Sequence, residues 1–275
     1  MENSVLEENV VNSKSLFDNT DKVLENEYYD ANANQSGKVS NTKSALICYG
    51  NGAELGDFSL FAKYLKKNLT NKYLDSNIKI LRTYNRNELV DEIANCGLSE
   101  IAEFHIFSHA IGAGLFLGYH DSTYSTQRST FLSSNSAPTY EEVVDNEIGS
   151  LLTDHLITTY ALSQPVIKSV FTNLEFAKLW GCNSGVSNWI YDGTDPYWGA
   201  LNTKNNPKPS IAQCLSTFID KPVYGATSGS HIEYKIGGKW ISGYDYKRKF
   251  KKTYPNKYED IRLHPDRGDY VEYTP

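Results

Sequence analysis

Two residue types that support nucleophilic catalysis each follow a short apolar segment of this chain. Residues 174–180 are mostly apolar, and they lead through Gly181 to Cys182 and a run of polar turn formers. Residues 104–107 are apolar except for one position, and His109 follows them closely. A thiol and an imidazole base together form an activated nucleophile for acyl transfer. The sequence therefore predicts a cysteine hydrolase, and among these a peptidase, with Cys182 as the nucleophile and His109 as its base.

A hydrolase of this kind also needs hydrogen-bond donors for the negatively charged oxygen of its transition state. The backbone N–H groups of Ala110 and Cys182 are the candidates, because both residues lie among small residues that let an oxyanion approach the backbone. Another strand end carries hydroxyl groups, and the segment after residue 118 carries a histidine and an aspartate. These side chains are the candidates for substrate binding: Thr227, Ser228, Ser230, His120 and Asp121.

The remaining histidines and cysteines indicate structural roles. His105 lies inside an apolar strand on the same face as Phe107, so we expect it to pack. His231 is a second-choice base, and His264 is expected at the surface. Three cysteines in strand or helix patterns are expected to be buried: Cys48, Cys96 and Cys214. The chain has no CxxC pair and no HExxH motif, so neither a metal nor another cofactor is expected.

The elements before His109 alternate in type. Apolar runs predict strands at residues 45–50, 78–81 and 104–107, and apolar residues at helical spacing predict helices at residues 58–69 and 87–96. This strand–helix alternation indicates a parallel sheet with helices on its faces. In such a sheet, functional groups gather beyond the carboxyl ends of the strands, where His109 and Cys182 both stand.

The rest of the chain is expected to extend this sheet. The glycine-containing segment 112–118 predicts a hairpin or a further strand, and the Ser- and Thr-rich residues 119–138 predict a loop. We expect further elements in the following order: a helix at 140–162, a strand at 174–180, an ordered loop at 191–209, a helix at 211–219 and a strand at 222–226. A Tyr-rich hairpin or lobe is expected from residue 232 onward.

Composition limits the classes of function. The 275 residues carry a net charge of −6, which argues against a general nucleic-acid binder. No membrane span and no ordinary secretion signal is visible, so we expect a cytoplasmic protein or one exported by a signal-independent system. Residues 1–43 hold eight acidic and four basic residues with weak apolar periodicity, which predicts a polar tail. The expected partner is a polypeptide substrate or another protein, and the oligomeric state is left open.

The two blocks around the candidate dyad resemble the caspase-like (clan CD type) cysteine peptidases. The blocks read Phe104-His105-Ile106-Phe107-Ser108-His109-Ala110 and Phe176-Ala177-Lys178-Leu179-Trp180-Gly181-Cys182. The resemblance implies an α/β three-layer sandwich with a mostly parallel sheet of about six strands in caspase-like topology. It implies His109 as base, Cys182 as nucleophile, and the N–H groups of Ala110 and Cys182 as the oxyanion site.

The chain departs from this family in three respects. Ala110 stands where the family usually has glycine, and the Gln-Ala-Cys-x-Gly signature of caspases is absent. The separation of 182 − 109 = 73 residues exceeds the roughly 50 residues of caspases, so the resemblance implies an inserted segment near 119–170. The expected organisation is a tail at 1–43 and a domain at 44–275, without the aspartate specificity of caspases.

Two alternatives follow from other features. Residues Ser108 to Gly112 resemble the G-x-S-x-G nucleophile elbow of α/β-hydrolases, with Ala110 at the serine position. On that interpretation the protein is an inactive relative, or one altered at Ala110. The second alternative is a non-enzymatic α/β domain whose Tyr-rich C-terminal lobe binds a partner protein.

Overall fold

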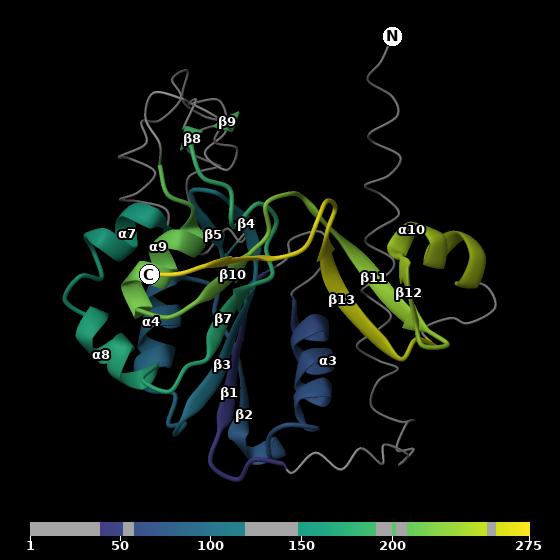
Figure 1. The fold of residues 1–275 in the computed structure, drawn as a ribbon, viewed down its shortest axis with the longest axis horizontal. Helices are drawn as coiled ribbons and strands as arrows, with labels where there is room; N and C mark the ends of the chain where they lie inside the picture. The colour runs from purple at the N-terminus through teal and green to yellow at the C-terminus, as the bar shows by residue number, and fades with distance from the viewer. Residues whose placement is uncertain (1–38, 52–57, 119–147, 191–199, 202–207, 252–256) are drawn as a thin grey trace.

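The computed structural model describes residues 39–51, 58–118, 148–190, 200–201, 208–251 and 257–275. A six-stranded sheet with the order β14-β10-β7-β3-β1-β2 forms its centre (Figure 1), and every strand is parallel to its neighbours except β14, which pairs antiparallel with β10. The strands are β1 (Ser44–Tyr49), β2 (Ile78–Arg82), β3 (Ile101–Phe107), β7 (Phe176–Leu179), β10 (Val223–Gly225) and β14 (Val271–Tyr273). The prediction of an α/β fold around a mostly parallel sheet of about six strands is confirmed.

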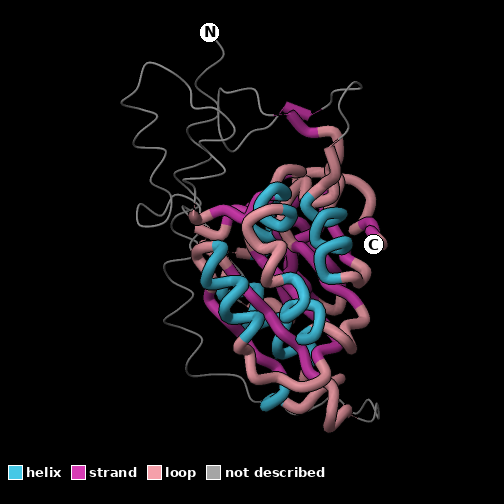
Figure 2. The backbone as a smooth tube through the Cα atoms, turned by 90° about the vertical axis from the view of Figure 1, so that its left-hand side faces the viewer, coloured by secondary structure: helices cyan, strands magenta, loops and turns pink. Residues whose placement is uncertain are grey.

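Helices cover one face of this sheet, and a helix with a smaller sheet covers the other (Figures 1 and 2). The first face carries α4 (Arg86–Ala94), α7 (Thr153–Ile157), α8 (Gln164–Val170) and α9 (Ile211–Ile219). The second face carries α3 (Ser59–Leu69) and a sheet of β11 (Ser230–Ile236), β12 (Lys239–Ser242) and β13 (Asp260–Pro265). Short elements complete the description: η2 (Asp75–Asn77), α10 (Gly243–Asp245) and η3 (Tyr246–Phe250).

Strand β1 is a continuous apolar run after Ser44 because both of its faces are buried. Leu46 and Cys48 of β1 belong to the core under α4 and α9, whereas Ala45 and Ile47 of the same strand belong to the core under α3. Strand β3 divides in the same way between the two cores. Burial on both faces fixes the register, because a one-residue slip would exchange the two sets of side chains.

Side-chain caps fix the first residues of helices α4 and α9. The side chain of Asn85 accepts a hydrogen bond from the Glu88 N–H at the start of α4, and Ser210 accepts one from Gln213 at the start of α9. These bonds satisfy amide groups that have no partner within the first turn. Helix α9 ends at Ile219; the next residue, Asp220, has a left-handed backbone, and the chain then enters β10.

A second small sheet follows β3 directly. It has the order β4-β5-β6, formed by β4 (His109–Ile111), β5 (Gly114–Phe116) and β6 (Ser150–Leu152). The hairpin expected within residues 112–118 is therefore present. The helix expected at 140–162 is confirmed only at residues 153–157 of the described part, because residues 150–152 pair with β5 as a strand and turns follow Ile157. Ile157, the last residue of this helix, is exposed, and α8 was not expected.

Aromatic rings of the Tyr-rich C-terminal segment pack on one another and belong to the same buried core as Ala45 and Ile47 of β1. Tyr234 and Tyr246 are both buried and stack with ring centroids 4.2 Å apart, and Tyr258 meets Tyr234 edge-on at 4.9 Å. The last strand, β14, leaves this lobe and returns to the edge of the central sheet, which the sequence did not indicate. Strands β8 (Trp189–Ile190) and β9 (Ala200–Leu201) form a separate pair.

Several expectations concern residues outside the described ranges. These are residues 1–38 of the expected tail, the expected loop at 119–138 with His120 and Asp121, residues 140–147, and most of the expected loop at 191–209. None of the described helices is long and apolar enough to cross a membrane.

Candidate catalytic site

The two blocks singled out in the sequence end at the same edge of the central sheet. Strands β3 and β7 are parallel neighbours, and Ile106 is the register partner of Leu179. His109 and Cys182 each stand three residues beyond this pair, which leaves both on the carboxyl-end rim. The Trp180 N–H donates to the Ile106 carbonyl at 2.9 Å, so the pairing continues up to the residue before Gly181.

A close backbone contact joins the two blocks beyond the end of the pairing. A Cβ atom built on Gly181 would lie 2.5 Å from Cβ of Ala110, 2.8 Å from the carbonyl oxygen of Ser108 and 3.2 Å from the Ala110 nitrogen. No side chain fits in that space, so glycine is required there. The residue before Cys182 therefore lies directly against the residue after His109.

His109 opens β4 and sits at the place where the order of the sheet reverses. Strand β1 lies between β2 and β3, and ligands of open α/β sheets bind at such a reversal. The His109 ring is partly buried and meets the Phe58 ring edge-on, with centroids 5.3 Å apart. At the same rim Asn51, just after β1, donates its N–H to the Leu117 carbonyl at 2.7 Å.

Cys182 differs from the other cysteines in exposure and in backbone setting. Cys48, Cys96 and Cys214 are buried, as expected, whereas Cys182 is partly exposed in a turn. Asn183 adopts a left-handed backbone with φ of 54° and donates its N–H to the Ser228 carbonyl. This turn therefore holds Cys182 against the segment that follows β10.

The hydroxyl group of Ser184 fixes the same turn from the inside. It is fully buried, accepts the Ala226 N–H at 3.0 Å and donates to the Gly181 carbonyl at 3.1 Å. Both partners are backbone groups of the two strand ends that frame Cys182. Because these groups would otherwise lack partners in the interior, the bonds lock the turn to the end of β10.

The turn at residues 227–230, expected to bind substrate, lies beside the candidate nucleophile. The Ser230 N–H donates to the Cys182 sulfur at 3.2 Å. The Ser228 hydroxyl accepts the Arg267 N–H at 3.1 Å, and Thr227 is exposed. The described part of the expected binding set is thus assembled at Cys182.

Below Cys182 lies a cation between two aromatic rings, which sequence reasoning did not find. The Lys178 ammonium group is 4.0 Å from the centre of the Trp180 ring and 3.9 Å from that of Tyr270. Burial lowers the pKa of Lys178 to about 8, and the carboxylate of Asp269 opposes part of this shift. Burial and the nearby Cys182 sulfur raise the pKa of Tyr270. The sequence feature that could have indicated this site is Lys178, the one charged residue of the otherwise apolar strand β7.

His105 is occupied by a buried hydrogen-bond network and is not placed to act as the base. Its Nε2 lies 3.1 Å from a Glu103 carboxylate oxygen, and its Nδ1 accepts from the Trp180 indole at 3.3 Å. Burial lowers the pKa of His105, so the neutral ring donates to Glu103 through Nε2. Burial alone would raise the pKa of Glu103, but its hydrogen bonds from His105, Lys72 and Tyr73 hold that pKa at about 2.

Among the described residues, one group has the ligand types and spacing to hold a metal ion. It consists of His231, Glu233 and His264, whose ligand atoms lie within 4.8 Å of one another. Sequence reasoning missed it because it searched for closely spaced ligands, and His264 reaches the group only through the pairing of β11 with β13. The sequence feature that could have indicated it is the spacing of His231 and Glu233, which places both on one face of a strand.

The comparisons with known proteins leave the family open. No protein-family model, no curated protein and no solved structure matches this chain. The structure itself bears on the elbow alternative, because a nucleophile elbow runs from a strand through a tight turn into a helix. Residues 109–116 instead form the β4–β5 hairpin, and Ala110 is buried with its Cβ toward Gly181.

Proposed function

We propose that this protein is a cysteine hydrolase of the peptidase class, with Cys182 as nucleophile and His109 as general base. The observation that carries the proposal is the contact of Gly181 with Ala110, because it brings the residues adjoining the thiol and the imidazole together on one rim. A strand-end thiol that is partly exposed beside small residues is accessible to a carbonyl substrate. Caspase-like topology belongs to this proposal, and the order of the sheet is compatible with it.

The proposed reaction is acyl transfer to water. His109 accepts the thiol proton, and the Cys182 sulfur attacks the carbonyl carbon of the scissile amide. The resulting oxyanion is stabilised by the backbone N–H groups of Ala110 and Cys182. As the tetrahedral species collapses, the C–N bond breaks and the amine leaves with the proton from His109. Water, deprotonated by His109, then attacks the thioester, and Cys182 leaves as the thiol.

A covalent probe tests this proposal without a known substrate. A mixture of peptidyl acyloxymethyl ketones with varied side chains should label wild-type protein at Cys182. His109→Ala should slow that labelling at pH 7 by at least about 100-fold, the lower range for loss of a general base. Cys96→Ala is the matched control, because Cys96 is buried away from the rim and its loss should leave labelling unchanged.

The same variants should be assayed for hydrolysis of fluorescently labelled casein. We expect hydrolysis in the wild type and in Cys96→Ala, and its loss in Cys182→Ala with the circular dichroism spectrum unchanged. Labelling that is equally fast in His109→Ala, or hydrolysis that survives in a folded Cys182→Ala protein, would refute the dyad.

A further inference from the structure

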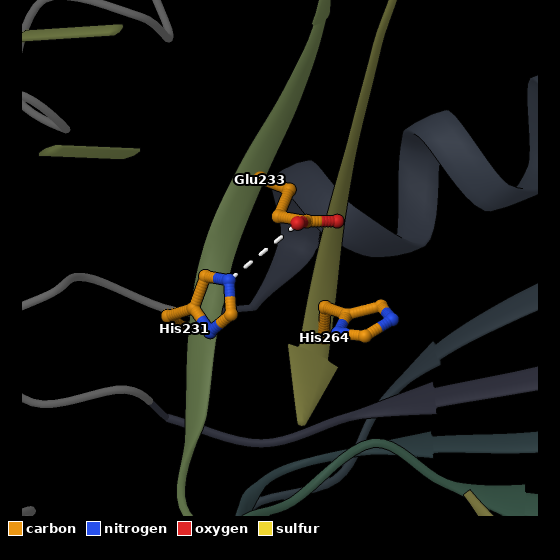
Figure 3. Close-up of side chains that lie close together, drawn as sticks. All are labelled: His231, Glu233 and His264. Atoms are coloured by element: carbon orange, nitrogen blue, oxygen red, sulfur yellow. Dashed lines mark ion pairs between the residues drawn. The ribbon is translucent and has the colours of Figure 1, made fainter. Parts of the chain in front are cut away.

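The outer face of the β11–β13 pair carries a histidine–carboxylate–histidine group that contains neither candidate catalytic residue. His231 and Glu233 alternate along β11 and therefore share one face, and His264 is the cross-strand partner of His231 on β13. Figure 3 shows the side chains of His231 and Glu233 facing each other, with His264 beside them on the neighbouring strand. We propose that this group is a binding site for a divalent transition-metal ion of the Zn²⁺ class.

The carboxylate is oriented for this task by an arginine. Arg262 contacts Oε2 of Glu233 through both Nε and Nη2, each at 2.8 Å. The other oxygen, Oε1, is thereby left facing Nε2 of His231 at 3.5 Å. The positive charge of Arg262 balances the carboxylate on one oxygen only, so the second oxygen keeps its capacity to coordinate a cation.

The imidazole of His231 is oriented by a second carboxylate. Its Nδ1 lies 2.8 Å from Oδ1 of Asp266. A carboxylate that accepts the N–H of one ring nitrogen leaves a lone pair on the other nitrogen, and this is the usual outer-shell arrangement of metal-binding histidines. In this tautomer, Nε2 of His231 and Oε1 of Glu233 are two acceptors that face each other.

The spacing of these two acceptors suits a shared metal ion. A separation of 3.5 Å exceeds the usual length of a hydrogen bond, roughly 2.7–3.2 Å. Two ligands on one tetrahedral Zn²⁺ ion stand about 3.3 Å apart, since each bond is about 2.0–2.1 Å long. One ring nitrogen of His264 lies within 4.8 Å of both. Nδ1 of His264 lies 2.9 Å from the Pro265 carbonyl, so metal binding as a third ligand requires this side chain to rotate. Two imidazoles and one carboxylate favour Zn²⁺ over the oxygen-preferring Ca²⁺ and Mg²⁺.

The bound ion would join β11 to β13 where the small sheet meets the catalytic rim. Ser230, the residue before His231, donates its N–H to the Cys182 sulfur, and Asp266 donates its own N–H to the Gly229 carbonyl. His231 and Asp266 of the proposed metal site therefore both adjoin the segment at residues 229–230 that touches the candidate nucleophile. The site itself contains neither Cys182 nor His109, so its existence does not depend on the proposed function.

Calorimetric titration with ZnCl₂ tests the site in tag-free full-length protein carrying Cys182→Ala, which removes the exposed thiol as a competing ligand. We expect one equivalent of Zn²⁺ to bind with micromolar or tighter affinity. Glu233→Gln and His264→Ala should each weaken binding at least tenfold, and Asp266→Asn should weaken it about 10–100-fold. Glu175→Gln, which alters a half-exposed carboxylate outside this group that pairs with Lys43, is the matched control for Glu233→Gln and should titrate like its parent.

Thermal melting of the same proteins with EDTA or with ZnCl₂ provides a second readout. The parent protein should melt at a higher temperature with Zn²⁺, whereas Glu233→Gln and His264→Ala should lose that rise while melting as sharply as the parent in EDTA. The proposal is overturned if the parent shows no saturable binding, because the contacts of His231 with Asp266 and Glu233 would then serve the fold alone. It is equally overturned if Glu233→Gln and His264→Ala bind Zn²⁺ as tightly as the parent.

Discussion

Gly181 lies so close to Ala110 that a Cβ atom on it would be only 2.5 Å from Cβ of Ala110. This contact joins the segment after β7 to the start of β4, and so links the residue before Cys182 to the residue after His109. The position of Cys182 relative to His109 therefore depends on an absent side chain at residue 181. It follows that the smallest possible enlargement at this position should disturb the site.

We expect Gly181→Ala to lower the free energy of unfolding by about 1–3 kcal/mol, the usual cost of overpacking. Because the shortest contact is with the Ala110 side chain, adding Ala110→Gly should restore part of the loss. The contact with the Ser108 carbonyl at 2.8 Å remains in the double variant, so recovery should be incomplete. Urea unfolding of the two single variants, the double variant and the wild type measures the coupling, and strictly additive effects would contradict the contact.

Iodoacetamide at pH 7 should alkylate Cys182 at least about tenfold faster than any other cysteine, since thiolate fraction and access control the rate. Cys48, Cys96 and Cys214 are buried, and burial also raises the pKa of Cys48 and raises that of Cys214 to about 11. Peptide mass spectrometry over a time course gives the four rates. Cys182→Ser should abolish the fast phase, and fast labelling of a buried cysteine would argue against this placement of the thiols.

Local patterns were sufficient to predict the strands that position the site. Strands β1, β3 and β7 are short and mostly apolar, so composition marks them despite Glu103, His105 and Lys178, and the residue at each strand end can be read from the sequence. The placement of His109 and Cys182 at strand ends can therefore be predicted from the sequence. Strand β6 was missed because its leucines also fit a helical period, and the pairing with β5 decides its conformation.

Contacts between distant segments could not be predicted. The Ser230 N–H reaches the Cys182 sulfur only because β11 begins where β10 ends, next to β7. Tyr270 meets Lys178 across the fold, and β14 is short and partly exposed, without the alternation that marks a strand. In each case pairing or packing between segments far apart in the chain decides the outcome, and neither has a local pattern.

Lys178 should make stability rise with pH in a defined window. The unfolded chain keeps the lysine proton up to about pH 10.5, whereas the folded protein releases it from about pH 8 because its pKa is lowered by burial. Between these values the unfolded state binds more protons, so the free energy of unfolding increases by up to about 1.4 kcal/mol per pH unit. Lys178→Met retains the packing between Trp180 and Tyr270 without the charge and should lack this contribution.

Urea unfolding at pH 7, 8, 9 and 10 measures the difference between Lys178→Met and the wild type. We expect the variant to be the more stable protein at pH 7, with an advantage that shrinks as the pH approaches 10. The matched control is Lys239→Met at an exposed position of β12, for which the difference from wild type should stay constant. A constant difference for Lys178→Met as well would show that the Lys178 ammonium group is not desolvated.

Glu103 should be a main source of acid sensitivity. Its carboxylate is buried and accepts hydrogen bonds from Lys72 and Tyr73 at 2.9 Å each, in addition to His105. The pKa of Glu103 is lowered from 4.5 to about 2 in the folded state, so its contribution to stability is present above pH 4.5 and is lost as the pH falls toward 2. Glu103→Gln should cost about 3–5 kcal/mol at pH 7, because it leaves the buried donors without their charged acceptor.

The pH dependence separates this role from a simple packing role. Between pH 4.5 and 2 the wild type should lose stability faster than Glu103→Gln, so the two unfolding curves should converge. Glu175→Gln is the matched control, since Glu175 pairs with Lys43 at the surface, where such a pair contributes at most about 1 kcal/mol. If Glu103→Gln differed from the wild type by the same amount at pH 3 and at pH 7, the carboxylate would not be ionised within the network.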